Sequence, residues 1–227
     1  MGDRKTITIG VLALQGAFRE HIESILRLSP DYPEYTINAV EVRRASQLDQ
    51  IDGLIIPGGE STAMSVISNM SQMHKNFYKD QDLNVLQGIS SSYLKSKKPV
   101  WGTCAGAILL SRDIENMNRE YMSEGKKLLG QMNMTISRNY FGSQAQSFEK
   151  DIEVHIDGAD KSYPGVFIRA PAIMNTDSDV QVLATLQFKD KNVIVAAQQE
   201  HMLATVFHPE LTEDLTFHKH FIDMIVK

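Results

Sequence analysis

The feature that most constrains the fold is an alternation, along the first half of the chain, between short apolar runs and segments of helical periodicity. β-Rich runs occupy residues 7–14 (ITIGVLAL), 35–43 (YTINAVEVR), 51–59 (IDGLIIPGG) and 98–106 (KPVWGTCAG), and helical periodicity occupies 17–28 and 107–117. Strands that alternate with helices and end in glycine turns favour a parallel sheet covered by helices on both faces.

The second half of the chain is richer in strands and poorer in helices. Strand-like runs occupy residues 131–143, 151–156, 165–174 and 180–210, and 211–227 predicts a closing helix. The expected fold class is therefore α/β, with a three-layer, mostly parallel central sheet, helices on both faces and antiparallel strands in the C-terminal half. Because the chain shows no linker or internal repeat, we expect residues 1–227 to form a single domain.

The composition is that of an ordinary globular protein, with 42% hydrophobic and 22% charged residues and a net charge of −5. No run of basic residues is longer than a pair, such as Arg43-Arg44 or Lys97-Lys98, so we expect neither a nucleic-acid nor a membrane partner. No run is long enough to span a bilayer, and the N-terminus does not fit a signal peptide. The single cysteine cannot form an internal disulfide, which favours a cytoplasmic location.

That cysteine, Cys104, lies in Gly102-Thr103-Cys104-Ala105-Gly106, between a predicted strand and a predicted helix. A nucleophile flanked by glycines at such a sharp turn is the arrangement of a nucleophile elbow. The Ala105 amide, at the start of the following helix, is free to donate to an oxyanion. The alternative is a buried structural cysteine, while a redox sensor would lack a second cysteine to resolve it.

A nucleophilic thiol needs a base, and the chain has seven histidines. His208 is distinguished by a strand-like run before it and by Pro209 and Glu210 after it. In an extended segment, residues two apart project to one side, so the Glu210 carboxylate is expected to orient the imidazole. His201 stays undecided, and the others are expected to be surface or hydrogen-bonded polar residues: His21 on an amphipathic helix, His74 in a polar loop, His155 in a strand, and His218 and His220 on the last helix.

The motifs WGTCAG and HPE resemble those of the triad (class I) glutamine amidotransferases. A more particular resemblance is to the glutaminase subunits of pyridoxal 5′-phosphate synthases. It rests on GVLALQGAFREH (10–21), LIIPGGEST (54–62), VWGTCAGAILLS (100–111), RNYFGSQAQSF (138–148), FIRAP (167–171) and TVFHPEL (205–211), in this order along nearly the whole chain.

The resemblance implies hydrolysis of L-glutamine to L-glutamate and ammonia through a γ-glutamyl thioester on Cys104. His208 would move the proton, Glu210 would orient the ring, and the amides of Gly59 (or Gly58) and Ala105 would form the oxyanion hole. The residues implied to bind glutamine are Gly58, Gly59, Glu60, Arg138, Ile168 and Arg169. Neither a cofactor nor a metal ion is expected.

The resemblance also implies a partner, the (β/α)₈-barrel subunit of the synthase, which would receive the ammonia. Gln15 and Gly16 would belong to the docking region, although a plain strand-to-helix turn explains them too. Two stretches depart from compact members of the family, at Ser68–Ser92 and Asn116–Lys127, and are expected to be loop insertions. A glutaminase of another pathway, a γ-glutamyl hydrolase and a catalytically idle binding relative remain open alternatives.

Overall fold

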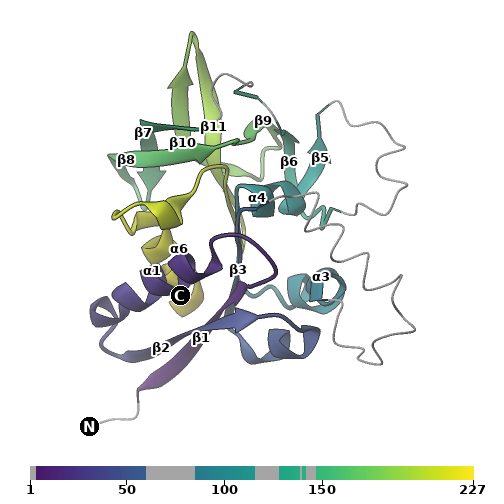
Figure 1. The fold of residues 1–227 in the computed structure, drawn as a ribbon, viewed down its shortest axis with the longest axis vertical. Helices are drawn as coiled ribbons and strands as arrows, with labels where there is room; N and C mark the ends of the chain where they lie inside the picture. Colours follow the sequence, from purple (N-terminus) through teal and green to yellow (C-terminus); the bar gives the residue numbers. More distant parts are fainter. Residues whose placement is uncertain (1–3, 60–84, 116–127, 139, 142–146) are drawn as a thin grey trace.

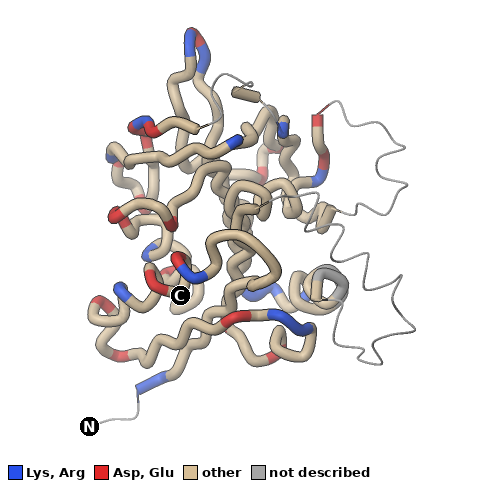
Figure 2. The backbone as a smooth tube through the Cα atoms, in the orientation of Figure 1, with Lys and Arg blue, Asp and Glu red and all other residues tan. Residues whose placement is uncertain are grey.

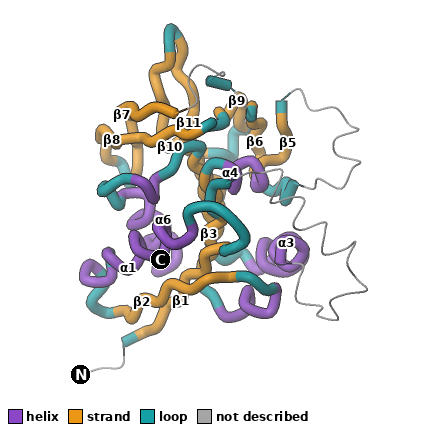
Figure 3. Tube along the Cα trace, in the orientation of Figure 1, coloured by secondary structure: helices purple, strands orange, loops and turns teal. Residues whose placement is uncertain are grey.

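The computed structural model describes residues 4–59, 85–115, 128–138, 140–141 and 147–227 (Figure 1). Glu60, most of the first expected insertion and all of the second lie outside these residues. The described strands form one mixed sheet of twelve, in the main order β2-β1-β3-β4-β12-β11-β10-β7-β8. Figure 3 shows helices around β1, β2 and β3, whereas the part of the molecule that contains β7, β8, β10 and β11 is built almost entirely from strands.

Five strands run parallel and form what we call the parallel half of the sheet. They are β2 (Tyr35–Val42), β1 (Lys5–Leu12), β3 (Gly53–Ile56), β4 (Val100–Thr103) and β12 (Met202–Thr205). Strands β3, β4 and β12 are buried at every position, because helices or loops cover both faces. Their apolar side chains therefore run continuously rather than in alternation, as the sequence predicts.

The antiparallel half continues the same sheet with four strands, joined as β11-β10-β7-β8. They are β11 (Lys191–Gln199), β10 (Gln181–Phe188), β7 (Ser147–Ile156) and β8 (Ala159–Ile168). Three further strands, β5 (Ser111–Ile114), β6 (Met132–Ser137) and β9 (Ala172–Thr176), lie off the main path, and β9 pairs with β11. The predicted fold class, a mostly parallel α/β sheet with antiparallel strands added in the C-terminal half, is confirmed.

Helices cover the parallel half. The described α-helices are α1 (Phe18–Arg27), α3 (Val85–Gly88), α4 (Ala105–Leu110) and α6 (Thr216–Val226), and shorter helical turns occupy Ser29–Asp31, Ala45–Gln50, Ile89–Tyr93, Leu94–Ser96 and Pro209–Leu211. Helix α6 packs on β3 so closely that a Cβ on Gly53 would lie 2.4 Å from Ile225 Cδ1. In Figure 1, α1 and α6 lie on one side of β3 and α3 on the other, which gives the three layers.

The helix predicted at 107–117 is wrong in its second half. Helix α4 ends at Leu110, and Ser111–Ile114 forms strand β5, which pairs in parallel with β6. The Ser111 hydroxyl donates to the Ile108 carbonyl over 2.8 Å, and the Ser111 backbone is extended, with ψ at 148°. A serine that bonds back to the preceding turn closes the helix, and pairing with a distant strand then overrides local propensity.

The buried side of helix α1 is not the side that all of its apolar residues would predict. Leu26, one of the apolar residues of this helix, is 45% exposed. The buried residues of the helix are His21, Ser24 and Ile25. A histidine and a serine thus occupy the inward face, which places polar groups behind the sheet ends described below.

Charged residues of both signs are interspersed over the outer segments, and the centre of the molecule is largely without them (Figure 2). Within the described ranges, no helix has both the length and the apolar character that crossing a bilayer requires.

Candidate active site

The candidate site lies where four neighbouring strands of the parallel half end. Strands β1, β3, β4 and β12 are adjacent in that order, so their carboxyl ends meet at one edge of the sheet. The segments that follow them carry Gln15-Gly16, Gly58-Gly59, Cys104 and His208, respectively. Ligands of open α/β sheets bind at this edge, so the topology brings together motifs that are far apart in the sequence.

Cys104 occupies the sharp turn between β4 and α4. Its backbone has φ 47° and ψ −104°, a conformation that L-residues avoid and that is held here by close packing. The Cys104 N–H donates to the Thr205 carbonyl of β12 over 2.8 Å. A Cβ on Gly102 would lie 2.5 Å from the Gly106 carbonyl, and one on Gly106 would lie 1.9 Å from the Ile56 carbonyl. Both glycines of the motif are therefore required by close approach of the backbone.

His208 lies beside Cys104 and is held by Glu210. The His208 Nδ1 atom is 2.8 Å from Glu210 Oε1, and the Glu210 side chain is fully buried. The His208 backbone N–H donates to the Val166 carbonyl of β8 over 2.8 Å. A Cβ on Gly58 would lie 2.6 Å from His208 Cε1 and 3.1 Å from the Cys104 Cβ, so the imidazole and the cysteine flank the same glycine.

Glu210 reaches the imidazole by a route other than the extended segment that the sequence suggests. Residues Pro209–Leu211 form a turn of 3₁₀-helix directly after His208. Pro209 takes the first helical position, where its missing N–H costs no hydrogen bond. The turn folds the carboxylate back onto the imidazole, and the Leu211 N–H donates to the His208 carbonyl over 3.3 Å.

Two opposing effects set the pKa of His208. Burial lowers it, but hydrogen bonds to Cys104 and Glu210, together with the negative charge of these groups, raise the pKa to about 10. The imidazole is therefore positively charged near neutral pH when it faces a thiolate and a carboxylate. An imidazolium between those two groups is suited to return a proton to a leaving group.

The loop after β3 is fixed from two sides. The Gly58 N–H donates to Thr103 Oγ1 over 2.9 Å, so this amide is already engaged and Gly59 is the better oxyanion donor. A Cβ on Gly16, whose φ is 86°, would lie 1.7 Å from the Gly58 carbonyl oxygen. A Cβ on Gly59 would lie 3.5 Å from Gln15 Cγ. The Gln15-Gly16 segment therefore packs directly on the Gly58-Gly59 loop, which carries the expected oxyanion donors (the oxyanion loop).

Three of the residues expected to bind glutamine, Arg138, Ile168 and Arg169, come from strands outside the parallel half. Ile168 ends β8, two residues beyond the Val166 that holds the His208 backbone, and it is 37% exposed. Arg169 follows it, is exposed and has a φ of 46°, a strained value for a non-glycine residue. Arg138 follows Ser137 of β6, which pairs with Ala172 of β9, and so the two arginines lie at the ends of neighbouring segments.

Sequence reasoning missed two buried histidines behind Glu210. His21 was expected to be a surface or hydrogen-bonded polar residue. Its side chain is fully buried and hydrogen-bonded, and its Nε2 atom is 3.3 Å from Glu210 Oε2, a place beside the candidate site that the sequence did not predict. His218 is fully buried as well, with Nε2 2.9 Å from His21 Nδ1. Helical spacing gave one signal: His21 is three residues after Phe18 and four before Ile25, on the side of a helix that carries apolar residues.

Comparisons with known proteins agree with this geometry. A family model described as the SNO glutamine amidotransferase family matches residues 11–227. The pyridoxal 5′-phosphate synthase subunit PdxT of Carboxydothermus hydrogenoformans is 42% identical over 96% of this chain and 98% of its own. The PdxT subunit of Brevibacillus brevis is 44% identical, with 96% of each chain covered.

A solved structure agrees as well. A crystal structure of a glutamine amidotransferase superposes on this chain with a TM-score of 0.74. The two sequences are 36% identical, and the match covers 96% of this chain and 99% of the other. The resemblance predicted from the motifs is confirmed.

Proposed function

Because the chain belongs to the SNO glutamine amidotransferase family, we propose that it is the glutaminase subunit of a pyridoxal 5′-phosphate synthase. It hydrolyses L-glutamine to L-glutamate and ammonia and supplies the ammonia to a synthase subunit in vitamin B6 synthesis. No cofactor enters this reaction. The free Cys104 thiol suits a reducing compartment such as the cytoplasm.

One observation carries the proposal. A strained cysteine at the end of β4 meets an imidazole whose other nitrogen is 2.8 Å from a buried carboxylate. These groups are the parts of a nucleophile, base and orienting-acid triad, recognised by geometry rather than by sequence position. The proposed catalytic residues are Cys104, His208 and Glu210.

In the first half of the reaction, the Cys104 sulfur attacks the side-chain amide carbon of glutamine. The carbonyl oxygen becomes an oxyanion, which accepts hydrogen bonds from the amides of Gly59 and Ala105. The Ala105 N–H belongs to the first residue of α4 and has no acceptor within the helix. As the tetrahedral intermediate collapses, the C–N bond breaks, and His208 passes its proton to the leaving nitrogen, which departs as ammonia.

In the second half, water hydrolyses the thioester. His208, now neutral, takes a proton from the water as the water oxygen attacks the thioester carbon. The C–S bond breaks, glutamate leaves, and the thiolate and imidazolium are restored. Glu210 keeps the imidazole in one orientation and stabilises its positive charge in both halves of the reaction.

Free glutamine is a zwitterion, so its recognition requires groups of both charges. We assign the α-carboxylate to Arg138 and Arg169, since a guanidinium binds a carboxylate through two parallel hydrogen bonds. The exposed Ile168 side chain provides an apolar wall beside them, and the Gly58-Gly59 backbone lines the opposite side. Glu60, which lies outside the described residues, is the proposed partner of the α-ammonium group.

The partner follows from the fate of the product. Ammonia released into neutral water becomes ammonium, which is no nucleophile, so the subunit must dock on the synthase that consumes it. We propose that the partner is a (β/α)₈-barrel subunit and that docking involves Gln15 and Gly16. Since these residues pack on the Gly58-Gly59 loop, binding there changes the oxyanion hole directly.

The test is ammonia release from glutamine by the wild type and by Cys104→Ala, each with and without a candidate barrel synthase. We expect low activity alone, a marked rise with the synthase and no turnover by Cys104→Ala. Full activity without a partner would overturn the docking part of the proposal. Turnover of another γ-glutamyl compound in place of glutamine would favour the γ-glutamyl hydrolase.

A second measurement separates the enzyme from an idle relative. A glutamine-analogue electrophile is expected to label Cys104, as seen by mass spectrometry, and the Cys104→Ala protein stays unlabelled. If the wild type is not labelled even with the synthase present, the chain is a binding subunit without catalysis.

A further inference from the structure

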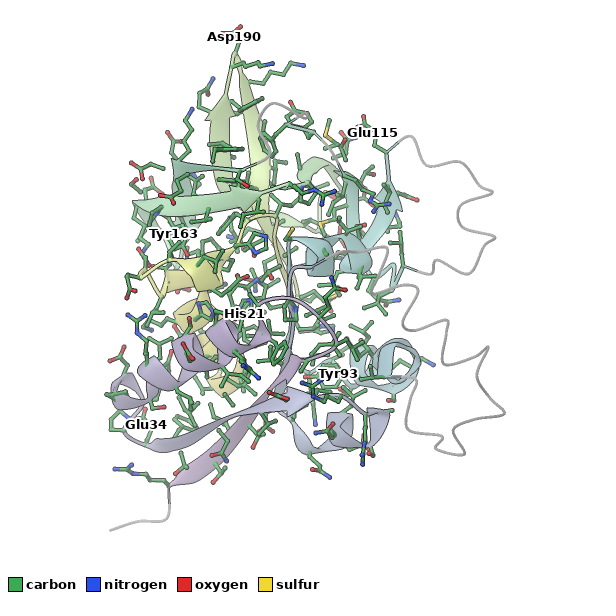
Figure 4. The ribbon with its side chains drawn as sticks, in the orientation of Figure 1. His21, Glu34, Tyr93, Glu115, Tyr163 and Asp190 are labelled. Atoms are coloured by element: carbon green, nitrogen blue, oxygen red, sulfur yellow. The ribbon has the colours of Figure 1, made fainter. Side chains whose placement is uncertain are left out.

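Behind the proposed triad lies a buried chain of polar side chains that the reaction scheme does not use. His21 of α1 is its centre, and the residue lies near the middle of the molecule (Figure 4). Its Nε2 atom is 3.3 Å from Glu210 Oε2 and 3.4 Å from Thr103 Oγ1, and its Nδ1 atom is 2.9 Å from His218 Nε2. His21, Thr103 and His218 are all fully buried.

This cluster connects the two sides of the candidate site. Glu210 uses its Oε1 atom for His208, while Thr103 Oγ1 accepts the N–H of Gly58 in the oxyanion loop. His21 lies between these two groups and contacts both. A shift of its side chain therefore moves the carboxylate that orients the base and the hydroxyl that holds the loop.

The hydrogen positions follow from what each tautomer leaves unpaired. If His21 carries its proton on Nε2, it faces the Glu210 carboxylate as a donor, and His218 Nε2–H donates to His21 Nδ1. His218 Nδ1, which has no hydrogen-bond partner among the described residues, is then a bare acceptor. The opposite tautomer would bury an unpaired N–H on His218 and turn a lone pair toward a carboxylate 3.3 Å away.

Both supporting histidines are neutral. Burial is the main cause that holds the pKa of His21 well below its usual value, and the positive charge of His208 lowers this pKa further. Burial, with a smaller effect of Arg27, lowers the pKa of His218 to about 3. A neutral His21 that carries its proton on Nε2 has one N–H to give. Glu210 Oε2 makes no hydrogen bond among the described residues, and it lies 3.3 Å from that nitrogen, about as near as the Thr103 Oγ1 atom at 3.4 Å.

From this geometry we infer that His21 is a positioning residue of the glutaminase: it holds Glu210 through Nε2 and is itself oriented by His218. The inference rests on the proposed function, since it assigns His21 a role toward the proposed catalytic base. Stacking supports it, because Trp101 packs edge-on against both imidazoles, with ring centroids 5.4 Å from His21 and 4.9 Å from His218. The His21 ring is thus fixed on its apolar side as well.

Three substitutions at one position test the role. His21→Gln keeps an amide N–H near the place of Nε2, His21→Asn puts its amide near Nδ1 instead, and His21→Leu has no donor. In the complex with the synthase, we expect His21→Leu and His21→Asn to lower kcat about 10- to 100-fold while KM stays within about twofold, since misorientation of a catalytic group costs turnover rather than binding. His21→Gln is expected to recover most of the loss.

The matched control is His220→Gln, which changes another buried histidine of the same helical layer. His220 lies on α6 and its Nε2 atom is 2.7 Å from Gln198 Oε1, away from Glu210. Its replacement is expected to lower thermal stability as much as His21→Gln does, with kcat unchanged. A loss of kcat in His220→Gln as large as that in His21→Leu would mean that the His21 effect is general destabilisation and would overturn the inference.

A spectroscopic readout keeps the inference separate from the proposed function. In proton NMR spectra of the imidazole N–H groups, we expect the His208 Nδ1–H resonance to be shifted or lost in His21→Leu and retained in His21→Gln. An unchanged resonance in all three variants would refute the positioning role even if no glutaminase activity were found. If Cys104→Ala hydrolysed glutamine as fast as the wild type, the proposed triad would be refuted. The inference about His21 would then be decided by the NMR spectra alone.

Discussion

The parallel and antiparallel halves of the sheet contain the same local motifs in opposite surroundings. Each has a glycine with positive φ at a strand end: Gly16, with φ 86°, would place a Cβ 1.7 Å from a carbonyl, whereas Gly158, with φ 76°, has nothing within 4 Å. Each has an imidazole beside a carboxylate two or five residues on, but His208-Glu210 is buried and His155-Asp160 is exposed. Surroundings, rather than the motif, therefore separate a candidate site from a surface turn.

The largest predicted difference between the halves concerns the two imidazole–carboxylate pairs. His208→Gln removes the proposed general base, and we expect kcat for glutamine hydrolysis to fall about 10⁴-fold with the synthase present. His155→Gln removes the exposed counterpart, whose Nδ1 atom is 2.6 Å from Asp160 Oδ1. Its kcat is expected to equal that of the wild type. Comparable losses in the two proteins would break the contrast between buried and exposed pairs.

The two glycines give the next effect in size. Gly16→Ala is expected to lower kcat about 10²-fold, because the added methyl group must push the Gly58 carbonyl and so displace the oxyanion loop. Gly158→Ala introduces the same methyl group at a similar φ but in open space. It therefore measures backbone strain without collision.

Steady-state kinetics, together with melting temperatures, separates the two causes. We expect Gly158→Ala to lower the free energy of unfolding by about 1 kcal/mol and to leave the activity unchanged. If both variants lost stability and activity to the same extent, strain alone would explain Gly16.

The halves also differ in how well sequence reasoning predicts them. The sequence predicts the Cys104 turn and the His208-Pro209-Glu210 segment because the signals for each are local. Glycines, proline and strand-like runs lie within a few residues of the functional group. Helix α4 was extended too far, since strand β5 depends on pairing with β6, about twenty residues later. Helical spacing indicates only that His21 is buried. Its contact with Glu210 spans most of the chain, so no local pattern predicts that contact.

The third prediction asks whether the antiparallel half binds substrate without taking part in the chemistry. Arg169→Ala is expected to raise KM for glutamine about 10- to 100-fold, because it removes a charge-assisted hydrogen bond to the substrate. The change in kcat is expected to be much smaller. Lys191→Ala, on the exposed β10–β11 hairpin of the same half, serves as the charge-matched control and should leave KM unchanged. A fall in kcat at constant KM for Arg169→Ala would instead place this arginine with the reacting atoms.

The last effect is a pH dependence of stability, and it contrasts two kinds of buried imidazole: His208, which contacts Glu210, and His218, which lies behind His21. The pKa of His208 is raised to about 10, so its contribution to stability is present below its unfolded value of about 6.5 and disappears as the pH rises toward 10. His218 behaves in the opposite way. Burial lowers its folded pKa to about 3, so below about pH 6.5 the unfolded chain takes up a proton that the folded chain refuses.

The free energy of unfolding should therefore fall with decreasing pH between about 6.5 and 3, by about 1.4 kcal/mol per pH unit from His218 alone. His218→Gln cannot take up that proton, so its slope in urea-unfolding experiments is expected to be smaller than the wild-type slope by this amount. Equal m-values at each pH serve as the control that both proteins expose the same surface. If the free energy of unfolding depended on pH equally in the two proteins, His218 would be protonated within the folded chain. The claim that His21 and His218 are both neutral would then be wrong.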